Sequence, residues 1–433
     1  MRTILSLLAL FSLCGLRAQD YNASYGLESP GGEVNVHPTA TSAATSQPGT
    51  DNRYLTRLNS WEQNGNIFST AFTVPFAWIN RQVFFRLEQA SGEYDVRING
   101  RKVAYNADGN APAVINITKQ VGEGRNLVEV IVTQPSPTAL LESWREAPAP
   151  AIAGASIMSQ PTMHIRDILV RTRMGEDGDA SAEVAIVVKS DALNPRSSRI
   201  FYDLLSPAGR NAATGYKDIT LDMRREDTVR FLARIPADSL WSAAQPTLYT
   251  LRVKTQHEGR DEEFVQIPLG FRAVTVEGKQ MSINAQPVTL RVREVPGTIP
   301  QQEVEALRKE GYNTLKLLPG PVPEPLLDSC DRWGLYVIAQ APIDTRRSGE
   351  SRKIGGNPSN DPRWKEAYLE RTENNYHATK RHPSVIAFSL ATRSANGINL
   401  YESYLNLKRF GDERPLIYPD GGGEWNNDPL LTE

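Results

Sequence analysis

The pattern of apolar and polar residues changes near Met281, and this change constrains the fold more than any other feature of the sequence. Between residues 68 and 270, short β-branched and aromatic runs alternate with polar residues and are separated by Gly, Asn and Asp. After the change, strand-like and helix-like runs alternate, which is the pattern of a parallel sheet covered by helices. A chain of 433 residues is also too long for one ordinary core. We therefore expect all-β domains followed by an α/β domain.

Residues 53–160 predict a jelly-roll β-sandwich that ends in a connector. Asn99-Gly100 lies between two alternating runs and is a strong signal for a tight hairpin turn. By contrast, prolines and alanines are frequent in residues 134–161, which disfavours regular strand pairing. We expect that stretch to run along the sandwich as a connector.

Residues 161–272 predict a second, immunoglobulin-like β-sandwich, because strand patterns recur there without helical periodicity. The strand-like runs lie at residues 164–170, 182–188, 199–204, 229–235 and 249–253.

Residues 273–433 predict part of a (β/α) barrel with about five strands. The expected strands are residues 289–292, 313–318, 335–339, 384–390 and 415–418, and the expected helices include 300–310, 364–380 and 400–410. An open parallel sheet exposes apolar faces and an edge. We therefore expect the preceding sandwiches or another chain to cover it.

The most specific motif is RHPSVIAFSLATRS at residues 381–394. It resembles the fourth barrel strand of glycoside hydrolase family 2, which includes β-galactosidases and β-glucuronidases. Further blocks that resemble this family, in its order and spacing, lie at residues 72–75, 83–87, 94–103, 246–251, 270–272 and 328–338. The resemblance implies a sugar-binding sandwich, an immunoglobulin-like domain and a (β/α) barrel.

The same motif lacks the residue that the family uses for proton transfer. The resemblance implies Gly-Asn-Glu after the strand, with Glu as the acid/base, but this chain has Ala391-Thr392-Arg393. A guanidinium cannot donate a proton to a leaving oxygen at neutral pH. The family's nucleophilic Glu is on the seventh strand, which this chain does not reach. Other family positions at the barrel mouth also differ, namely Arg293-Glu294, Leu318-Pro319-Gly320 and Gln340.

These features predict an exported, catalytically inactive family 2-like protein that is a binding or assembly component of the bacterial envelope. One alternative is an active exo-acting β-glycosidase of the β-galactosidase type, in which Glu424 or Asp420 has taken over with Glu294. Another alternative is a carbohydrate-binding protein that uses the first sandwich. Whether the chain is an enzyme stays open at this point.

A remnant of a substrate pocket is expected at the carboxyl ends of the barrel strands. Its candidate residues are Gln340, Thr392, Arg393 and Trp425. Arg393 would favour an acidic group, such as a uronate or a carboxylate of a protein partner. Alternatively, Arg393 pairs with Asp344 or Glu424 and fills the pocket.

No cofactor and no metal are predicted. The five histidines are scattered without zinc-ligand spacing, and no glycine cluster follows a strand and opens a helix. A formal net charge of −2 argues against a nucleic-acid partner, so a carbohydrate or an envelope protein is the expected partner. Four tryptophans either stack on sugar rings or pack in a core, namely Trp61, Trp78, Trp144 and Trp425.

Residues 1–18 predict a signal peptide, because Arg2 precedes an apolar run and Ala18 precedes Gln19. Residues 19–52 are expected to be extended, and the protein to be periplasmic, associated with the outer membrane, or secreted. Leu13 before Cys14 argues against lipidation. Cys330 is then the single cysteine of the mature chain, with an expected buried, inert thiol. No later run approaches the roughly 20 apolar residues of a membrane span.

Overall fold

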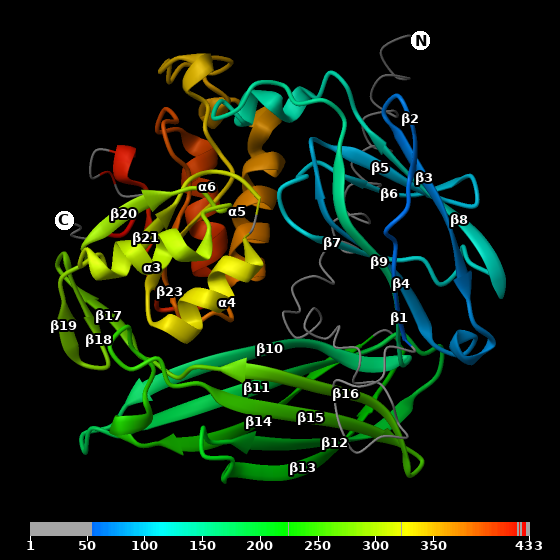
Figure 1. The fold of residues 1–433 in the computed structure, drawn as a ribbon, viewed down its shortest axis with the longest axis horizontal. Coiled ribbons are helices and arrows are strands. Elements are labelled where there is room, and N and C mark those ends of the chain that lie inside the picture. Colours follow the sequence, from blue (N-terminus) through cyan, green and yellow to red (C-terminus); the bar gives the residue numbers. More distant parts are fainter. Residues whose placement is uncertain (1–53, 224, 322, 422–423, 425–426, 430–433) are drawn as a thin grey trace.

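The computed structural model describes residues 54–429 apart from 224, 322, 422–423 and 425–426. The predicted signal peptide, the extended segment 19–52 and Trp425 lie outside the described residues. Figure 1 shows a first sandwich beside a parallel sheet with its helices, and a second sandwich beneath both. Of the helices in the described ranges, none combines the length and apolar character that a bilayer crossing requires.

The first sandwich consists of two sheets that enclose a core containing Phe85, Val96 and Val130. In order, one sheet is β1 (Leu55–Arg57), β9 (Ile152–Gln160), β4 (Gln82–Ala90) and β7 (Ala113–Asn116). The other is β2 (Glu62–Asn64), β3 (Ile67–Val74), β8 (Gly124–Val132), β5 (Tyr94–Ile98) and β6 (Arg101–Asn106).

The predicted hairpin is confirmed, whereas the predicted connector is only partly correct. Asn99 and Gly100 join β5 to β6 with φ values of 50° and 78°, which a tight hairpin turn requires at both positions. Residues 134–161 are not a connector throughout, because β9 pairs with both β1 and β4. The prolines precede this strand or follow it, so they remove no hydrogen bond from its ladder.

The second sandwich also has two sheets, around a core that includes Val184, Leu251 and Phe271. The first sheet is β10 (Met163–Met174), β11 (Ala180–Ser190) and β14 (Glu226–Ile235). The second is β13 (Asn211–Leu221), β12 (Arg196–Leu205), β15 (Tyr249–His257) and β16 (Arg260–Leu269). All five strand-like runs of the sequence fall within these strands. β13 and β16 were not predicted, because their many polar residues obscure the alternation.

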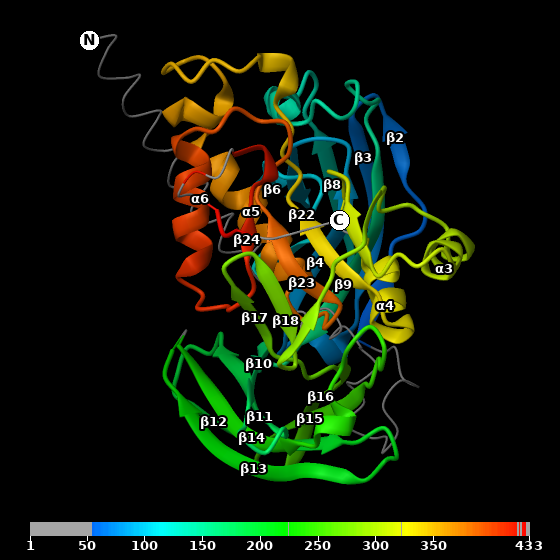
Figure 2. The same cartoon turned by 90° about the vertical axis from the view of Figure 1, so that its left-hand side faces the viewer.

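The last part of the chain forms a parallel sheet of five strands in sequence order, as the predicted barrel requires. The strands are β20 (Val292–Val295), β21 (Thr314–Leu317), β22 (Tyr336–Gln340), β23 (Val385–Ser389) and β24 (Leu416–Ile417). The helices are α3 (Gln301–Lys309), α4 (Glu324–Trp333), α5 (Lys365–Thr379) and α6 (Ile398–Lys408). Leu315, Val337 and Phe388 of the strands share one apolar core with the helices, and Figure 2 shows α5 and α6 on one flank of the strands and α3 and α4 on the other.

The first parallel strand begins at Val292, whereas the sequence predicted a strand at residues 289–292. Residues 274–288 instead form a small antiparallel sheet of β17 (Val274–Glu277), β18 (Gln280–Ile283) and β19 (Gln286–Val288). Arg293-Glu294 therefore lies within β20 and not after it. Glu294 pairs with Lys316 of the neighbouring strand at 2.8 Å, which removes it from the loops at the barrel mouth.

Candidate functional site

The carboxyl ends of β22 and β23 bring two polar side chains side by side. Gln340 ends β22 and Ser389 ends β23, and the two residues pair in register. Both are buried. Gln340 donates from Nε2 to its neighbour's carbonyl oxygen at 2.8 Å, but its Oε1 has no hydrogen-bond partner.

The loop after β23 places the next two candidate residues beside Asp344. The backbone N–H of Thr392 donates to Ile343 O at 3.0 Å, and Thr392 forms a parallel bridge with Asp344. Asp344 forms a second bridge with Glu142, which precedes β9 of the first sandwich. The structure thus brings Gln340, Thr392 and Arg393 to one end of the sheet.

Arg393 pairs with Asp344, which is the second of the two arrangements expected from the sequence. Its Nη2 lies 3.2 Å from Asp344 Oδ2, and Nη2 of Arg346 lies 3.0 Å from the same oxygen. Asp344 is fully buried, whereas the side chain of Arg393 is 45% exposed. One carboxylate thus faces two guanidinium groups, and Asp420 supplies a second carboxylate at the same loop.

The backbone of Arg393 is held in an unusual conformation. Its φ of 47° lies in the left-handed region, which is uncommon for a residue with a side chain. Its N–H donates to Asp420 Oδ2 at 2.5 Å. Asp420 therefore fixes the loop that aims the guanidinium toward Asp344.

The three carboxylates considered as replacements for the family's catalytic pair are occupied elsewhere. Glu294 pairs with Lys316, and Asp420 accepts from the Arg393 backbone. Glu424 accepts from Arg352 at 2.9 Å, and this hydrogen bond lowers the pKa of Glu424. A general acid needs the opposite shift, so the arrangement does not favour Glu424 as a proton donor.

Sequence reasoning missed the buried charge network that supports this site from the first sandwich. Glu142 accepts from Arg145 and from Asn110, each at 2.8 Å, and pairs with Arg371 of α5 at 2.9 Å. Burial opposes ionisation of Glu142, but the charges of Arg371 and Arg145 outweigh it and hold its pKa below the usual value. The role of Arg346 likewise becomes visible only in its pairing with Asp344, for which no local sequence pattern gives a signal.

The other candidate groups lie in structural positions. Trp78 is buried in the core of the first sandwich, and Trp61 packs against that core. Cys330 is buried, as predicted, and burial raises the pKa of its thiol.

Glu324, Asp328 and His382 have ligand atoms within 4.8 Å of one another and are a conceivable metal site. However, the guanidinium of Arg381 already pairs with Glu324 and lies 3.7 Å from Asp328, which opposes a cation there.

Three domain models of glycosyl hydrolases family 2 match the chain. The sugar binding domain matches residues 56–147, and the TIM barrel domain matches residues 274–431. A third model, described simply as glycosyl hydrolases family 2, matches residues 163–272 between them. These matches confirm the predicted fold class and the order of its parts.

Two similar curated relatives are β-galactosidases. The one from Priestia megaterium is 26% identical over 377 residues, and the one from Aeromonas hydrophila is 27% identical over 380 residues. These alignments cover 81% and 82% of this chain but 36% of each relative. The chain therefore spans about a third of the length of these relatives.

Solved structures with the same fold include two β-glucuronidases. The Bacteroides uniformis enzyme has a TM-score of 0.70 at 16% identity, covering 81% of this chain and 46% of the other. The Dictyoglomus thermophilum enzyme has a TM-score of 0.65 at 20% identity, covering 81% and 64%.

Proposed function

The chain belongs to glycosyl hydrolase family 2, and from that premise we propose that it binds an acidic ligand of the bacterial envelope instead of hydrolysing a glycoside. The ligand is an acidic glycan or a carboxylate of an envelope protein. Export is part of the proposal and rests on the sequence of residues 1–18.

The observation that carries the proposal is Arg393 itself, which stands at the position of the family's acid/base and keeps 45% of its side chain exposed although it pairs with Asp344. A guanidinium stays protonated at any physiological pH, so it cannot cycle a proton between enzyme and substrate. Arg346 shares the same carboxylate, so the pairing with Asp344 does not use all the N–H donors of Arg393. Arginine is well suited to hold a carboxylate through two parallel hydrogen bonds.

The second candidate is the activity in the names of the curated relatives, an exo-acting β-galactosidase reaction. It needs two carboxyl groups about 5 to 5.5 Å apart for a retaining mechanism. Glu294, Asp420 and Glu424 each have a different partner, as described above. The arrangement of the described residues therefore supports binding over hydrolysis.

A glycan array tests the proposal directly. We expect the native protein to bind uronate-bearing oligosaccharides or acidic peptides more strongly than neutral sugars, and Arg393→Gln to lose that preference. Arg363→Gln is the matched control, because Arg363 is an exposed arginine paired with Asp361 in the segment between β22 and α5. Equal binding by all three proteins, or preferential binding of neutral sugars, would contradict the proposal.

A further inference from the structure

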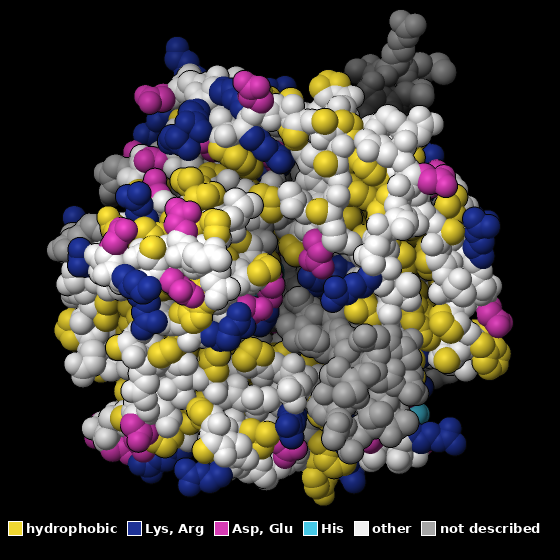
Figure 3. Space-filling view, in the orientation of Figure 1, with side chains coloured by type: hydrophobic (Ala, Val, Ile, Leu, Met, Phe, Trp, Pro, Cys, Tyr) yellow, Lys and Arg dark blue, Asp and Glu magenta, His cyan; other side chains and the backbone are white. Residues whose placement is uncertain are grey.

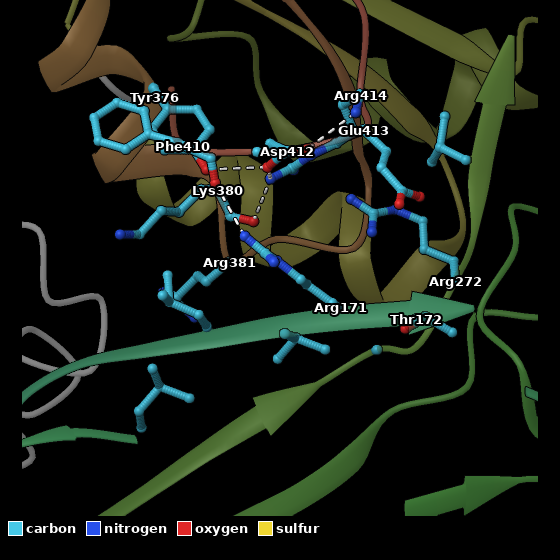
Figure 4. A pocket seen from close by; sticks show the side chains of 16 residues that line it. Arg171, Thr172, Arg272, Tyr376, Lys380, Arg381, Phe410, Asp412, Glu413 and Arg414 are labelled. Atoms are coloured by element: carbon cyan, nitrogen blue, oxygen red, sulfur yellow. Dashed lines mark hydrogen bonds and ion pairs between the residues drawn. The ribbon is translucent and has the colours of Figure 1, made fainter. Parts of the chain in front are cut away.

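A cavity of about 100 Å³ lies between the second sandwich and the parallel-sheet domain, away from the strand ends that carry Arg393. β10 and the segment after β16 form one wall, and the residues after α5 and α6 form the other (Figure 4). Its volume corresponds to roughly three water molecules at about 30 Å³ each. It therefore has room for a small polar ion.

Basic side chains outnumber acidic ones in the lining of this cavity. The charged residues that line it are Arg171, Arg272, Lys380, Arg381, Arg414, Asp412 and Glu413. Three of these cations have carboxylate partners: Lys380 pairs with Asp167, Arg381 with Glu324, and Arg414 with Asp412. In the part of the chain that the structure describes, Arg171 and Arg272 have no ion-pair partner.

Arg272 is the half-buried cation of the lining that forms no ion pair with the described residues. Its Nη2 donates to Val385 O at 2.6 Å, and Arg414 donates to the same oxygen from Nη1 at 3.1 Å. The Nε of Arg272 is buried and has no hydrogen-bond partner. Burial, and then the positive charge of Arg414, lower the pKa of Arg272 to about 9, although the carboxylates of Asp412 and Asp331 oppose this shift. The charge of Arg272 is thus only partly compensated, and an anion beside its guanidinium would offset the remaining cost of burial.

Arg171 supplies a second guanidinium from β10, on the same wall of the cavity as Arg272. It is exposed and donates from Nη2 to Phe410 O at 3.1 Å, and its other N–H groups have no partner among the described residues. Figure 4 shows its side chain reaching across the cavity from β10 toward Lys380 and Asp412. The unused N–H donors of Arg171 are therefore available to a ligand that is bound to Arg272.

We propose that this cavity is a binding site for a small tetrahedral oxyanion, a phosphate group held between Arg272 and Arg171. Guanidinium groups bind phosphate oxygens through paired N–H donors, and phosphate accepts from several directions at once. Of the two acidic residues in the lining, Asp412 is neutralised by Arg414 at 2.6 Å. Glu413 is exposed and opposes an anion, so it limits the affinity.

Thermal unfolding of the whole chain in phosphate tests the site. About 20 mM inorganic phosphate should raise the Tm by at least about 2 °C relative to potassium chloride of equal ionic strength. Arg171→Gln should abolish most of this shift. Arg173→Gln, which removes an exposed arginine from the same strand outside the cavity, should keep it.

Glu413→Gln is a second test, in which phosphate binding should become tighter instead of weaker. A gain in affinity cannot be explained by a variant that fails to fold. Removing its negative charge should lower the phosphate Kd several-fold in isothermal titration. The same titration with a sugar phosphate monoester shows whether the site takes free phosphate or the phosphate group of a larger ligand. Comparable affinity for the monoester indicates a larger ligand. Binding of inorganic phosphate alone indicates the free ion. Equal Tm shifts in chloride and phosphate, or an unchanged shift in Arg171→Gln, would overturn the proposal.

Discussion

Arg371 of α5 and Glu142 of the segment before β9 form a fully buried ion pair, with 2.9 Å between Nη1 and Oε1. The side chains are 1% and 5% exposed. This pair joins the first sandwich to the helices of the parallel-sheet domain, and the neighbouring Ser143 donates its N–H to Asp344 O at 2.8 Å. The position of Asp344 beneath Arg393 thus depends on contacts between two domains.

Removing one partner of this pair should destabilise the protein strongly. Arg371→Met leaves Glu142 buried with less compensation, and breaking a buried pair in this way typically costs about 3–5 kcal/mol. The midpoint of urea unfolding should fall accordingly. Arg199→Gln, which breaks the exposed Arg199–Asp218 pair of the second sandwich, should leave the midpoint nearly unchanged. Similar effects of the two variants would contradict the importance of the buried pair.

The purified chain should not release the chromophore from aryl β-galactosides, β-glucuronides or β-mannosides above the rate of a blank. Loss of the acid/base alone is expected to slow such a reaction by several orders of magnitude. Arg393→Glu should not restore turnover, because Glu294, Asp420 and Glu424 are each engaged elsewhere. Turnover that disappears on Glu294→Gln, Asp420→Asn or Glu424→Gln would instead support the hydrolase alternative.

Glu263 should make the stability depend on pH near neutrality. It is buried where the two sandwiches meet, accepting from Ile165 N at 2.8 Å and from Gln160 Nε2 at 2.9 Å. Burial raises its pKa from 4.5 to about 7, although these hydrogen bonds and the charge of Arg81 partly oppose the shift. The folded state holds the proton more tightly than the unfolded chain, so the free energy of unfolding falls as the pH rises from about 4.5 to about 7.

Glu263→Gln should remove this pH dependence. The side-chain NH2 group of the introduced glutamine would face one of the two N–H donors, which lowers the free energy of unfolding by the same amount at every pH. The amide cannot ionise, so it adds no pH dependence. Relative to the native protein, the variant should gain up to roughly 3 kcal/mol between about pH 5 and about pH 8. Urea titrations of both proteins at these two pH values measure the difference. If the two proteins differ in free energy of unfolding by the same amount at both pH values, Glu263 does not titrate in this range.

Gly334 should tolerate no side chain. It ends α4 with a φ of 75°, and a Cβ atom there would lie 2.2 Å from the carbonyl oxygen of Ala243. Gly334→Ala therefore forces the helix end away from the loop between β14 and β15 of the second sandwich, at a cost of about 3 kcal/mol or more. Gly178→Ala is the control: its φ of 85° carries the same backbone penalty of about 1 kcal/mol, with nothing within 4 Å of the added methyl. Equal losses of stability would show that the contact with Ala243 is unimportant.

The sequence predicted the elements of the fold well where the pattern is local. The Asn99-Gly100 turn and the last four parallel strands follow from residues that are adjacent in the chain. β9 was missed because its flanking prolines suggested an irregular connector, while its partners β1 and β4 lie far away in sequence.

The site could be predicted only in part, because its geometry depends on distant residues. The strand ends indicated Gln340 and Arg393, but the choice between Asp344 and Glu424 as the partner of Arg393 depends on loop conformation. No local pattern connects Arg171, Arg272 and Arg414, which come from β10, the end of the second sandwich and the approach to β24. Their common cavity exists only after the domains have docked.

The mixture of charges on the surface matches the composition. Lys and Arg side chains are interspersed with Asp and Glu over the face seen in Figure 3. On such a face, binding of a charged ligand depends on individual arginines with a defined environment.

The carbonyl of Val385 accepts hydrogen bonds from Arg272, at the end of the second sandwich, and from Arg414, just before β24. The indole of Trp241, also from the second sandwich, donates to Asp331 O of α4 at 2.9 Å. Arg272 and Trp241 of the second sandwich thus satisfy backbone carbonyl groups of β23 and α4 in the parallel-sheet domain. Folding of the parallel sheet should therefore be coupled to prior folding of the sandwich, and the two parts should melt as one cooperative unit.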